Sequence, residues 1–195
     1  MSRQAIVGMN IDANALNIRP ASAADLPDVL RLYQQPDLDH GQALPLPEAI
    51  AWFQKIQQYP SYRLFVAECN HRIVGTFMLL VLDNLLHLGA PSGIVEAVAV
   101  DAQYQSQGIG RQMMHWAMAA ARQSRCYKLV LSSSLTRDRA HAFYESLGFQ
   151  QHGLSFEVQL PQVPPTQSDE CPAEDQARTG HNSDASFLDS SFLLD

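Results

Sequence analysis

Two glycines that follow a short polar loop are the residues of this sequence best suited to chemistry. Gln105, Gly108 and Gly110 have the spacing Q-x-x-G-x-G. An apolar, strand-like run precedes them and a long helical pattern follows, so the spacing predicts a helix N-terminus with outward-facing backbone N–H groups. Such a row of N–H groups binds the oxygens of a pyrophosphate. The sequence therefore predicts a phosphate-bearing cofactor at this helix.

The segment differs from two common phosphate-binding motifs. It lacks the first glycine of the dinucleotide fingerprint G-x-G-x-x-G and the G-K-[ST] ending of a P-loop. By itself, a glycine pair after a strand also fits a simple tight turn. The preceding run, residues 94–100, alternates as a strand and is expected to place Glu96, Val98 and Val100 on one face.

A second motif follows one predicted helix and one predicted strand later, where residues 143–149 read F-Y-E-S-L-G-F. With both motifs in this order, residues 96–149 resemble the GNAT superfamily of N-acetyltransferases. In that superfamily, Q/R-x-x-G-x-G/A binds coenzyme A (CoA) and F-Y-x-x-x-G-F closes the domain. The resemblance implies an enzyme that uses acetyl-CoA as co-substrate.

The resemblance also implies which residues would hold CoA. The backbone of Val98, Ala99 and Val100 would pair with the pantetheine arm as an added strand. The pyrophosphate would lie among the backbone N–H groups of residues 107–111. The loop residues concerned are Gln105, Gln107, Gly108, Ile109, Gly110 and Arg111. Arg137, where many relatives carry Asn, or Arg139 would contact the 3′-phosphate.

Two residues are candidates for proton transfer. Tyr144 matches the general-acid position of the family, where a phenol protonates the departing thiolate; the alternative is a core aromatic beside Phe143. Glu96 is placed to deprotonate an amine directly or through water, and the alternative is a solvated acid without a catalytic role. His141 is expected to be a packed or solvent-facing histidine.

The acceptor is predicted to be the primary amine of a small molecule. The run R-x-x-A-H-x-F-Y from Arg137 to Tyr144 resembles acetyltransferases of the aminoglycoside and aminoalkylphosphonate kind. A glucosamine-phosphate type is the alternative at residues 126–129, although Ser132 and Ser133 replace the expected Asp-Cys pair. A protein or peptide N-acetyltransferase and a catalytically silent CoA-binding regulatory module also remain open.

The fold class predicted is α/β, with a mixed, mostly antiparallel central sheet flanked by helices in the order β-α-α-β-β-β-α-β-α-β. The expected strands cover residues 17–20, 62–68, 73–82, 93–100, 127–132 and 154–160, and the expected helices 23–34, 47–56, 108–124 and 137–147. The acceptor pocket is expected among the first two helices and the loops at 36–45 and 83–92. Residues 1–14 are predicted to be a flexible leader, 15–161 the domain, and 162–195 a disordered acidic tail.

Charge and composition limit the partners and the cellular compartment that we expect for this protein. Residues 161–195 hold seven acids and one base, a net charge of −6, which leaves −1 for the rest of the chain. No basic stripe indicates nucleic acid, and no apolar run reaches membrane-spanning length. Three cysteines and seven histidines without ligand spacing predict no metal site and favour a reducing cytoplasm. These observations are compatible with a homodimer.

Overall fold

The computed structural model describes residues 16–36, 38 and 41–158. It is built on a five-stranded sheet in the order β1-β2-β3-β4-β5. The first four strands pair antiparallel, and β4 pairs parallel with β5. The strands are β1 Leu16–Pro20, β2 Tyr62–Cys69, β3 Arg72–Leu82, β4 Ser92–Val100 and β5 Lys128–Val130. The predicted α/β class with a mostly antiparallel sheet is confirmed.

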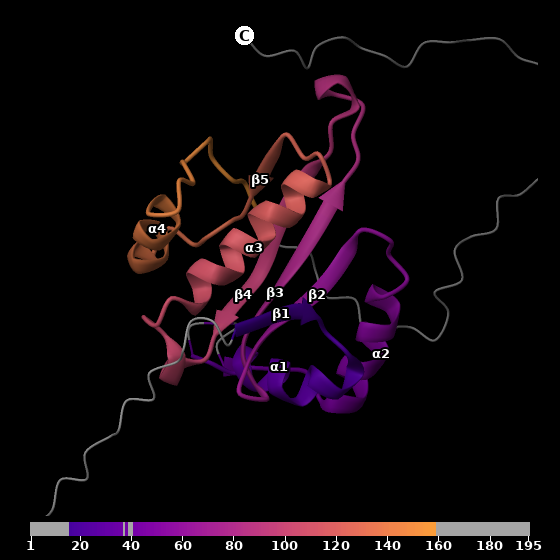
Figure 1. The fold of residues 1–195 in the computed structure, drawn as a ribbon, viewed down its shortest axis with the longest axis vertical. Helices are drawn as coiled ribbons and strands as arrows, with labels where there is room; N and C mark the ends of the chain where they lie inside the picture. Colours follow the sequence, from indigo (N-terminus) through magenta and orange to yellow (C-terminus); the bar gives the residue numbers. More distant parts are fainter. Residues whose placement is uncertain (1–15, 37, 39–40, 159–195) are drawn as a thin grey trace, which may run out of the picture. The chain divides into compact units, whose positions relative to one another are not determined.

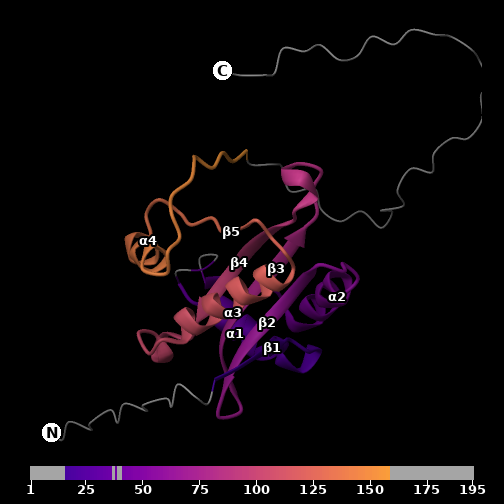
Figure 2. The same ribbon diagram turned by 45° about the horizontal axis from the view of Figure 1, so that its top comes forward.

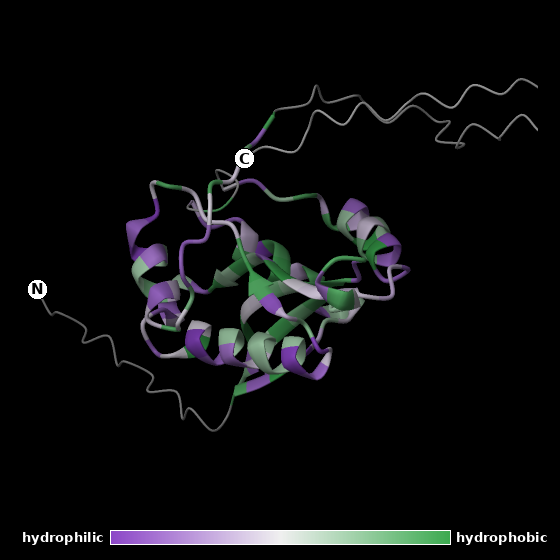
Figure 3. Cartoon of the chain, turned by 90° about the horizontal axis from the view of Figure 1, so that it is seen from above, coloured by the Kyte–Doolittle hydropathy of each residue, from purple (hydrophilic) through white to green (hydrophobic). Residues whose placement is uncertain are grey.

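Helices cover both faces of the sheet (Figure 1). The α-helices are α1 Leu26–Tyr33, α2 Leu46–Ile56, α3 Ile109–Gln123 and α4 Asp138–Glu145, and the 3-10 turns are η2 Ala23–Asp25, η4 His87–Gly89 and η5 Ala102–Tyr104. One core cluster joins α3 to the sheet, and a second joins α1 and α2 to the opposite face. Hydrophobic residues gather on the strands between these helices (Figure 3).

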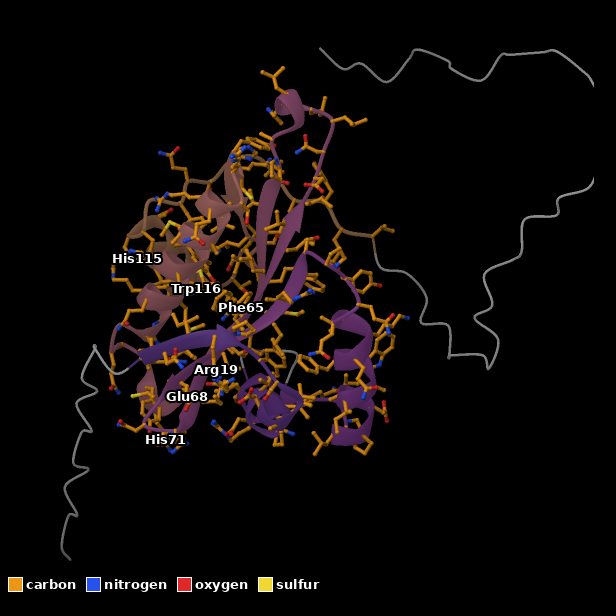
Figure 4. All side chains as sticks on the ribbon, turned by 45° about the vertical axis from the view of Figure 1, so that its right-hand side comes forward. Arg19, Phe65, Glu68, His71, His115 and Trp116 are labelled. Carbon is orange, nitrogen blue, oxygen red and sulfur yellow. The ribbon has the colours of Figure 1, made fainter. Side chains whose placement is uncertain are left out.

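The helix α3 is amphipathic, and its apolar stripe forms one of the two cores. Ile109, Met113 and Ala117 recur at helical spacing and are almost fully buried, as the sequence predicts. Trp116 packs its ring against Phe65 of β2, with 4.5 Å between ring centroids (Figure 4). This packing fixes the axis of α3 across the sheet and therefore the direction in which its N-terminus points.

The first helical segment begins with a capping box in which Ser22 and Asp25 exchange hydrogen bonds. Arg19 of β1 donates two hydrogen bonds of 2.8 Å to the Asp25 carboxylate and one of 2.9 Å to Glu68 of β2 (Figure 4). The hydrogen bonds from Arg19 hold the pKa of Asp25 well below its usual range. The network ties the start of α1 to the sheet.

A β-bulge interrupts β4 and corrects one prediction. Ala99 faces Thr76 and Glu96 faces Met78, so Ala97 and Val98 together oppose one residue of β3. Ala97 has a φ of +50°. Because the bulge adds one residue, the alternation of side chains reverses across it. Glu96 therefore shares the α1 side with Met78, whereas Val98 and Val100 pack on the α3 side.

Two predicted strands at the C-terminal end also need correction. The strand expected at 127–132 is formed only over Lys128–Val130. The strand expected at Leu154–Leu160 is not formed over its described residues 154–158, and Leu154 is 83% exposed. Alternation of apolar residues suits a strand, but a strand also needs a neighbouring edge with which to pair. Residues 159 and 160, the predicted leader and the predicted tail lie outside the described residues.

Candidate active site around strand β4

The loop between β4 and α3 is anchored by a buried carboxylate. Asp101 accepts a hydrogen bond of 2.7 Å from Arg31 of α1 and one of 3.3 Å from Arg72 of β3. It also accepts from the backbone N–H of Gln103 at 3.0 Å, which caps η5. Burial alone would raise the pKa of Asp101, but these donors more than offset it and the pKa lies below its usual value. Asp101 therefore stays charged and holds the start of the loop.

The N-terminus of α3 is an open site for an anion. Gly108 is its N-cap with a φ of +84°, and a Cβ built there would meet no atom within 4 Å. Among the described residues, no acceptor forms a hydrogen bond with the backbone N–H groups of residues 107–111. The first turn of α3 contains no acidic residue. These groups and the positive end of the helix dipole suit a pyrophosphate. The geometry thus fits the predicted phosphate site.

The second glycine of the motif has a packing role. A Cβ on Gly110 would lie 3.2 Å from the ring of Phe143 in α4. The side chain of Arg111 donates to the hydroxyl of Ser146 at 3.1 Å. Close packing at Gly110 and this hydrogen bond hold the Q-x-x-G-x-G loop and the F-Y-E-S-L-G-F segment against each other, so α4 lies beside the start of α3.

Strand β4 has an open edge beside this site. It pairs with β5 only from Ser92 to Ile94. Beyond Ile94, the β5-side edge of β4 has no strand partner within the described part of the chain, as far as Val100. An extended chain can add to such an edge by backbone hydrogen bonds. The open edge leads to the loop that begins at Asp101, so the residues fit the pantetheine arm and pyrophosphate of CoA.

Tyr144 is half-buried on the α3 side of the sheet. Its ring lies between those of Phe143, at 5.1 Å, and Phe149, at 5.8 Å. Burial raises the pKa of Tyr144, and the charge of Arg137 opposes this shift. The phenol therefore keeps its proton at neutral pH and is able to donate it. The aromatic neighbours also mean that Tyr144 serves the core, so both sequence interpretations have a structural basis.

Glu96 is exposed on the opposite face of β4, and sequence reasoning missed its partner. The hydroxyl of Tyr62 donates a hydrogen bond of 3.1 Å to its carboxylate. Burial, together with the neighbouring Glu96, raises the pKa of Tyr62 to about 12, so the phenol remains a donor across the physiological range. The bond orients one carboxylate oxygen and leaves the other available for a proton.

The remaining predicted residues lie on α4 and the loop before it. Arg137 is the exposed N-cap of α4, and its guanidinium makes no hydrogen bond or ion pair with a described residue. His141 donates from Nε2 to the carbonyl of Ser134 at 2.9 Å, which braces the loop before α4. His141 is thus a packed histidine. Arg139 is exposed like Arg137.

A cavity of about 400 Å³ opens on the face of β4 that carries Glu96. Its wall comes from α1, α2 and the segment between them, and its floor includes Leu64, Met78 and Ala97. The first two helices and the 36–45 loop were predicted to form the acceptor pocket and do line this cavity. The loop at 83–92, also predicted, contributes no lining residue.

Two further searches cover the described residues only. No group of three or more His, Cys, Asp and Glu side chains stands close enough to hold a metal ion. None of the helices has both the length and the apolar character that crossing a membrane requires.

Comparison with known proteins gives the family to which this fold belongs. The sequence profile described as "Acetyltransferase (GNAT) family" matches residues 26–149. The protein belongs to this family.

Individual relatives agree with this assignment. Glucosamine 6-phosphate N-acetyltransferase of Trypanosoma brucei brucei is 31% identical over 98 residues, which cover 50% of this chain and 65% of the relative. A protein of Agrobacterium tumefaciens str. C58, provisionally named an acetyltransferase, shares 33% identity with a TM-score of 0.68 over 74% of this chain and 99% of its own. A transcriptional regulator of Bacillus halodurans C-125 shares 26% identity with a TM-score of 0.67, and the same shares of both chains are covered. The chain thus spans slightly less than two thirds of the curated relative.

Proposed function

We propose that the protein transfers an acetyl group from acetyl-CoA to the primary amine of a small molecule, which attacks directly in a ternary complex. The observation that supports this most is the open stretch of β4 from Val95 to Val100, which connects two different sites. At its end it leads to the N–H groups at the start of α3, which have no acceptor within the described part of the chain. On the other face, the cavity reaches the bulge at Ala97.

The chain's own groups would divide the work between the two faces of β4. Acetyl-CoA supplies the acyl group and the thiolate leaving group. Glu96 takes a proton from the ammonium, directly or through water, so that the nitrogen lone pair is free to form the C–N bond. A backbone N–H at Val98 stabilises negative charge on the carbonyl oxygen. Tyr144 donates its proton to sulfur as the C–S bond breaks, and the second proton that the nitrogen loses, directly or through water, restores the phenol.

The remaining groups hold the donor. The N–H groups of residues 107–111 bind the pyrophosphate, and Gln105, which bonds to the Val100 carbonyl at 3.3 Å, shapes the approach to them. The guanidinium of Arg137, which has no partner among the described residues, offers a charge to the 3′-phosphate. Glu96 lies on the α1 side of the sheet and Tyr144 packs on the α3 side, an arrangement that supports an amine arriving from one side and a thiolate leaving on the other.

The test is to mix the protein with acetyl-CoA and a panel of amines and to follow free thiol and acetylated product. We expect thiol release that depends on the amine, with one acetylated amine formed per thiol. Binding of CoA without release from any amine would contradict the proposal and favour a regulatory module, a class named among the structural relatives.

A further inference from the structure

The cavity beside Glu96 has walls that are almost wholly apolar. Among the described residues, no Lys, Arg, Asp or Glu lines it, and its polar side-chain groups are the hydroxyl of Tyr33, the amide of Gln42 and the indole N–H of Trp52. The hydroxyl of Tyr33 is itself buried, without a hydrogen-bond partner in the described residues. A phosphate, a carboxylate or a polyhydroxylated ring would lose its water here without gaining enough partners.

Basic side chains near the cavity do not alter this character. Lys55 lies over the ring of Trp52 at 4.9 Å but does not line the cavity. Arg63 lines a separate, smaller hollow and donates to the carbonyls of Tyr59 and Tyr62. The sequence from 36 to 45 contains neither Lys nor Arg. The surroundings therefore offer no cluster of the kind that binds phosphate.

The position of the cavity fixes which part of a ligand meets which group. Ala97 forms part of its lining, and the neighbouring Glu96 is exposed on the same face as Met78. An ammonium at Glu96 would therefore have its substituent directed between α1 and α2. There it would meet the side chains of Leu30, Phe53 and Leu64. A volume of about 400 Å³ lies within the range of ligand pockets.

We infer that the acceptor is a primary amine on an uncharged apolar body, of the arylalkyl or alkyl type, and not an amino sugar phosphate. This inference rests on the proposed acetyl transfer. The amine nitrogen forms the new C–N bond as the C–S bond breaks; one proton of the ammonium passes to Glu96, and the second balances the proton with which CoA leaves as the thiol. The glucosamine 6-phosphate enzyme that resembles this chain acts on an acceptor of the opposite character.

The first experiment compares kcat/KM for phenethylamine, hexylamine, glucosamine 6-phosphate and a lysine peptide at saturating acetyl-CoA. We expect the two apolar amines to exceed the other two by at least about 30-fold, since burial of their bodies stabilises the bound state. Preference for the sugar phosphate or the peptide would overturn the inference and leave acetyl transfer intact. Thiol release from no amine would overturn both.

A matched pair of variants tests whether this cavity holds the apolar body. Leu44 lines it and is 46% exposed, so Leu44→Arg adds a charge at its edge with little effect on folding. Leu85 is 100% exposed and lies away from the cavity lining, so Leu85→Arg is the control. We expect Leu44→Arg alone to lower kcat/KM for phenethylamine about tenfold, with thermal melts confirming that both variants fold. Equal activity of both variants and wild type would overturn the assignment of the cavity.

Discussion

The two sides of β4 are built from different parts of the chain. The donor side consists mostly of backbone: N–H groups at the start of α3, a glycine of positive φ and an open strand edge. The acceptor side consists of side chains that come from α1, α2, β2, β3 and β4. Backbone geometry can be shared by all proteins that bind one cofactor, whereas a side-chain lining can change with each acceptor. If the proposed function holds, the donor side therefore keeps a geometry common to the family, whereas the acceptor side varies with the substrate.

The largest expected effect separates chemistry from cofactor binding on the donor side. Tyr144→Phe removes the phenol but keeps the ring packing with Phe143 and Phe149. We expect kcat to fall about 100-fold, the usual contribution of a general acid, while the Kd for CoA changes little. Tyr127→Phe, an exposed tyrosine stacked on His87, is the control. An unchanged kcat in Tyr144→Phe would leave Tyr144 with its packing role only.

A smaller effect is expected from the phosphate cradle. Gly108 and Gly89 both have positive φ and nothing within 4 Å of a built Cβ, so Ala costs each about 1 kcal/mol of backbone strain. Only at Gly108 does the new methyl stand in the space offered to the pyrophosphate. Calorimetric titration should show about tenfold weaker CoA binding for Gly108→Ala. The affinity of Gly89→Ala for CoA should equal that of the wild type. Equal weakening in both variants would contradict the cradle.

The smallest effect concerns Arg31, which connects the two sides of β4. It lies on α1 and donates a hydrogen bond to Asp101, at the start of the loop before α3. Arg31→Gln should reduce the free energy of unfolding by about 1 kcal/mol at pH 7, a modest value because its side chain is 39% exposed. The lowered pKa of Asp101 stabilises the fold above the unfolded pKa, and this contribution is lost as the pH falls through the folded pKa. Urea titrations should therefore show the difference shrinking below about pH 4.

Arg122→Gln is the control for this measurement, because Arg122 is exposed on α3 and forms no ion pair within the described residues. It should leave the free energy of unfolding unchanged at both pH values. A difference between wild type and Arg31→Gln that persists undiminished at pH 3 would mean that Asp101 is not the partner that matters.

Sequence reasoning succeeded where local pattern determines structure. The helical stripe of α3, the N-terminal glycine at 108 and the order of elements through α4 depend on neighbouring residues, and all were predicted. The prediction failed where the local structure depends on pairing with another strand. The bulge at Ala97 depends on how β4 pairs with β3, and the alternation of residues within β4 does not reveal that pairing. For the same reason the alternation at 154–158 gave a strand that the described structure lacks.

The candidate site follows the same division. The motif residues around Gly108 were predicted because they lie close together in the sequence, where a spacing pattern can be recognised. The Tyr62 partner of Glu96 and the Arg31 and Arg72 partners of Asp101 lie far away in sequence, so no spacing rule indicates them. A carboxylate directly after a strand, as at Asp101, was the one available signal.

The extra residue in β4 has a consequence for how this protein can change over evolutionary time. Loss of one residue between Glu96 and Ala99 would leave a single residue of β4 opposite Phe77, so Glu96 would still pair with Met78 and Ala99 with Thr76, but without a bulge. A deletion at this point would therefore remove the bulge itself and leave the faces of the flanking residues unchanged. The loop between β3 and β4 holds no strand pairing, so insertions should accumulate there and leave the bulge in place.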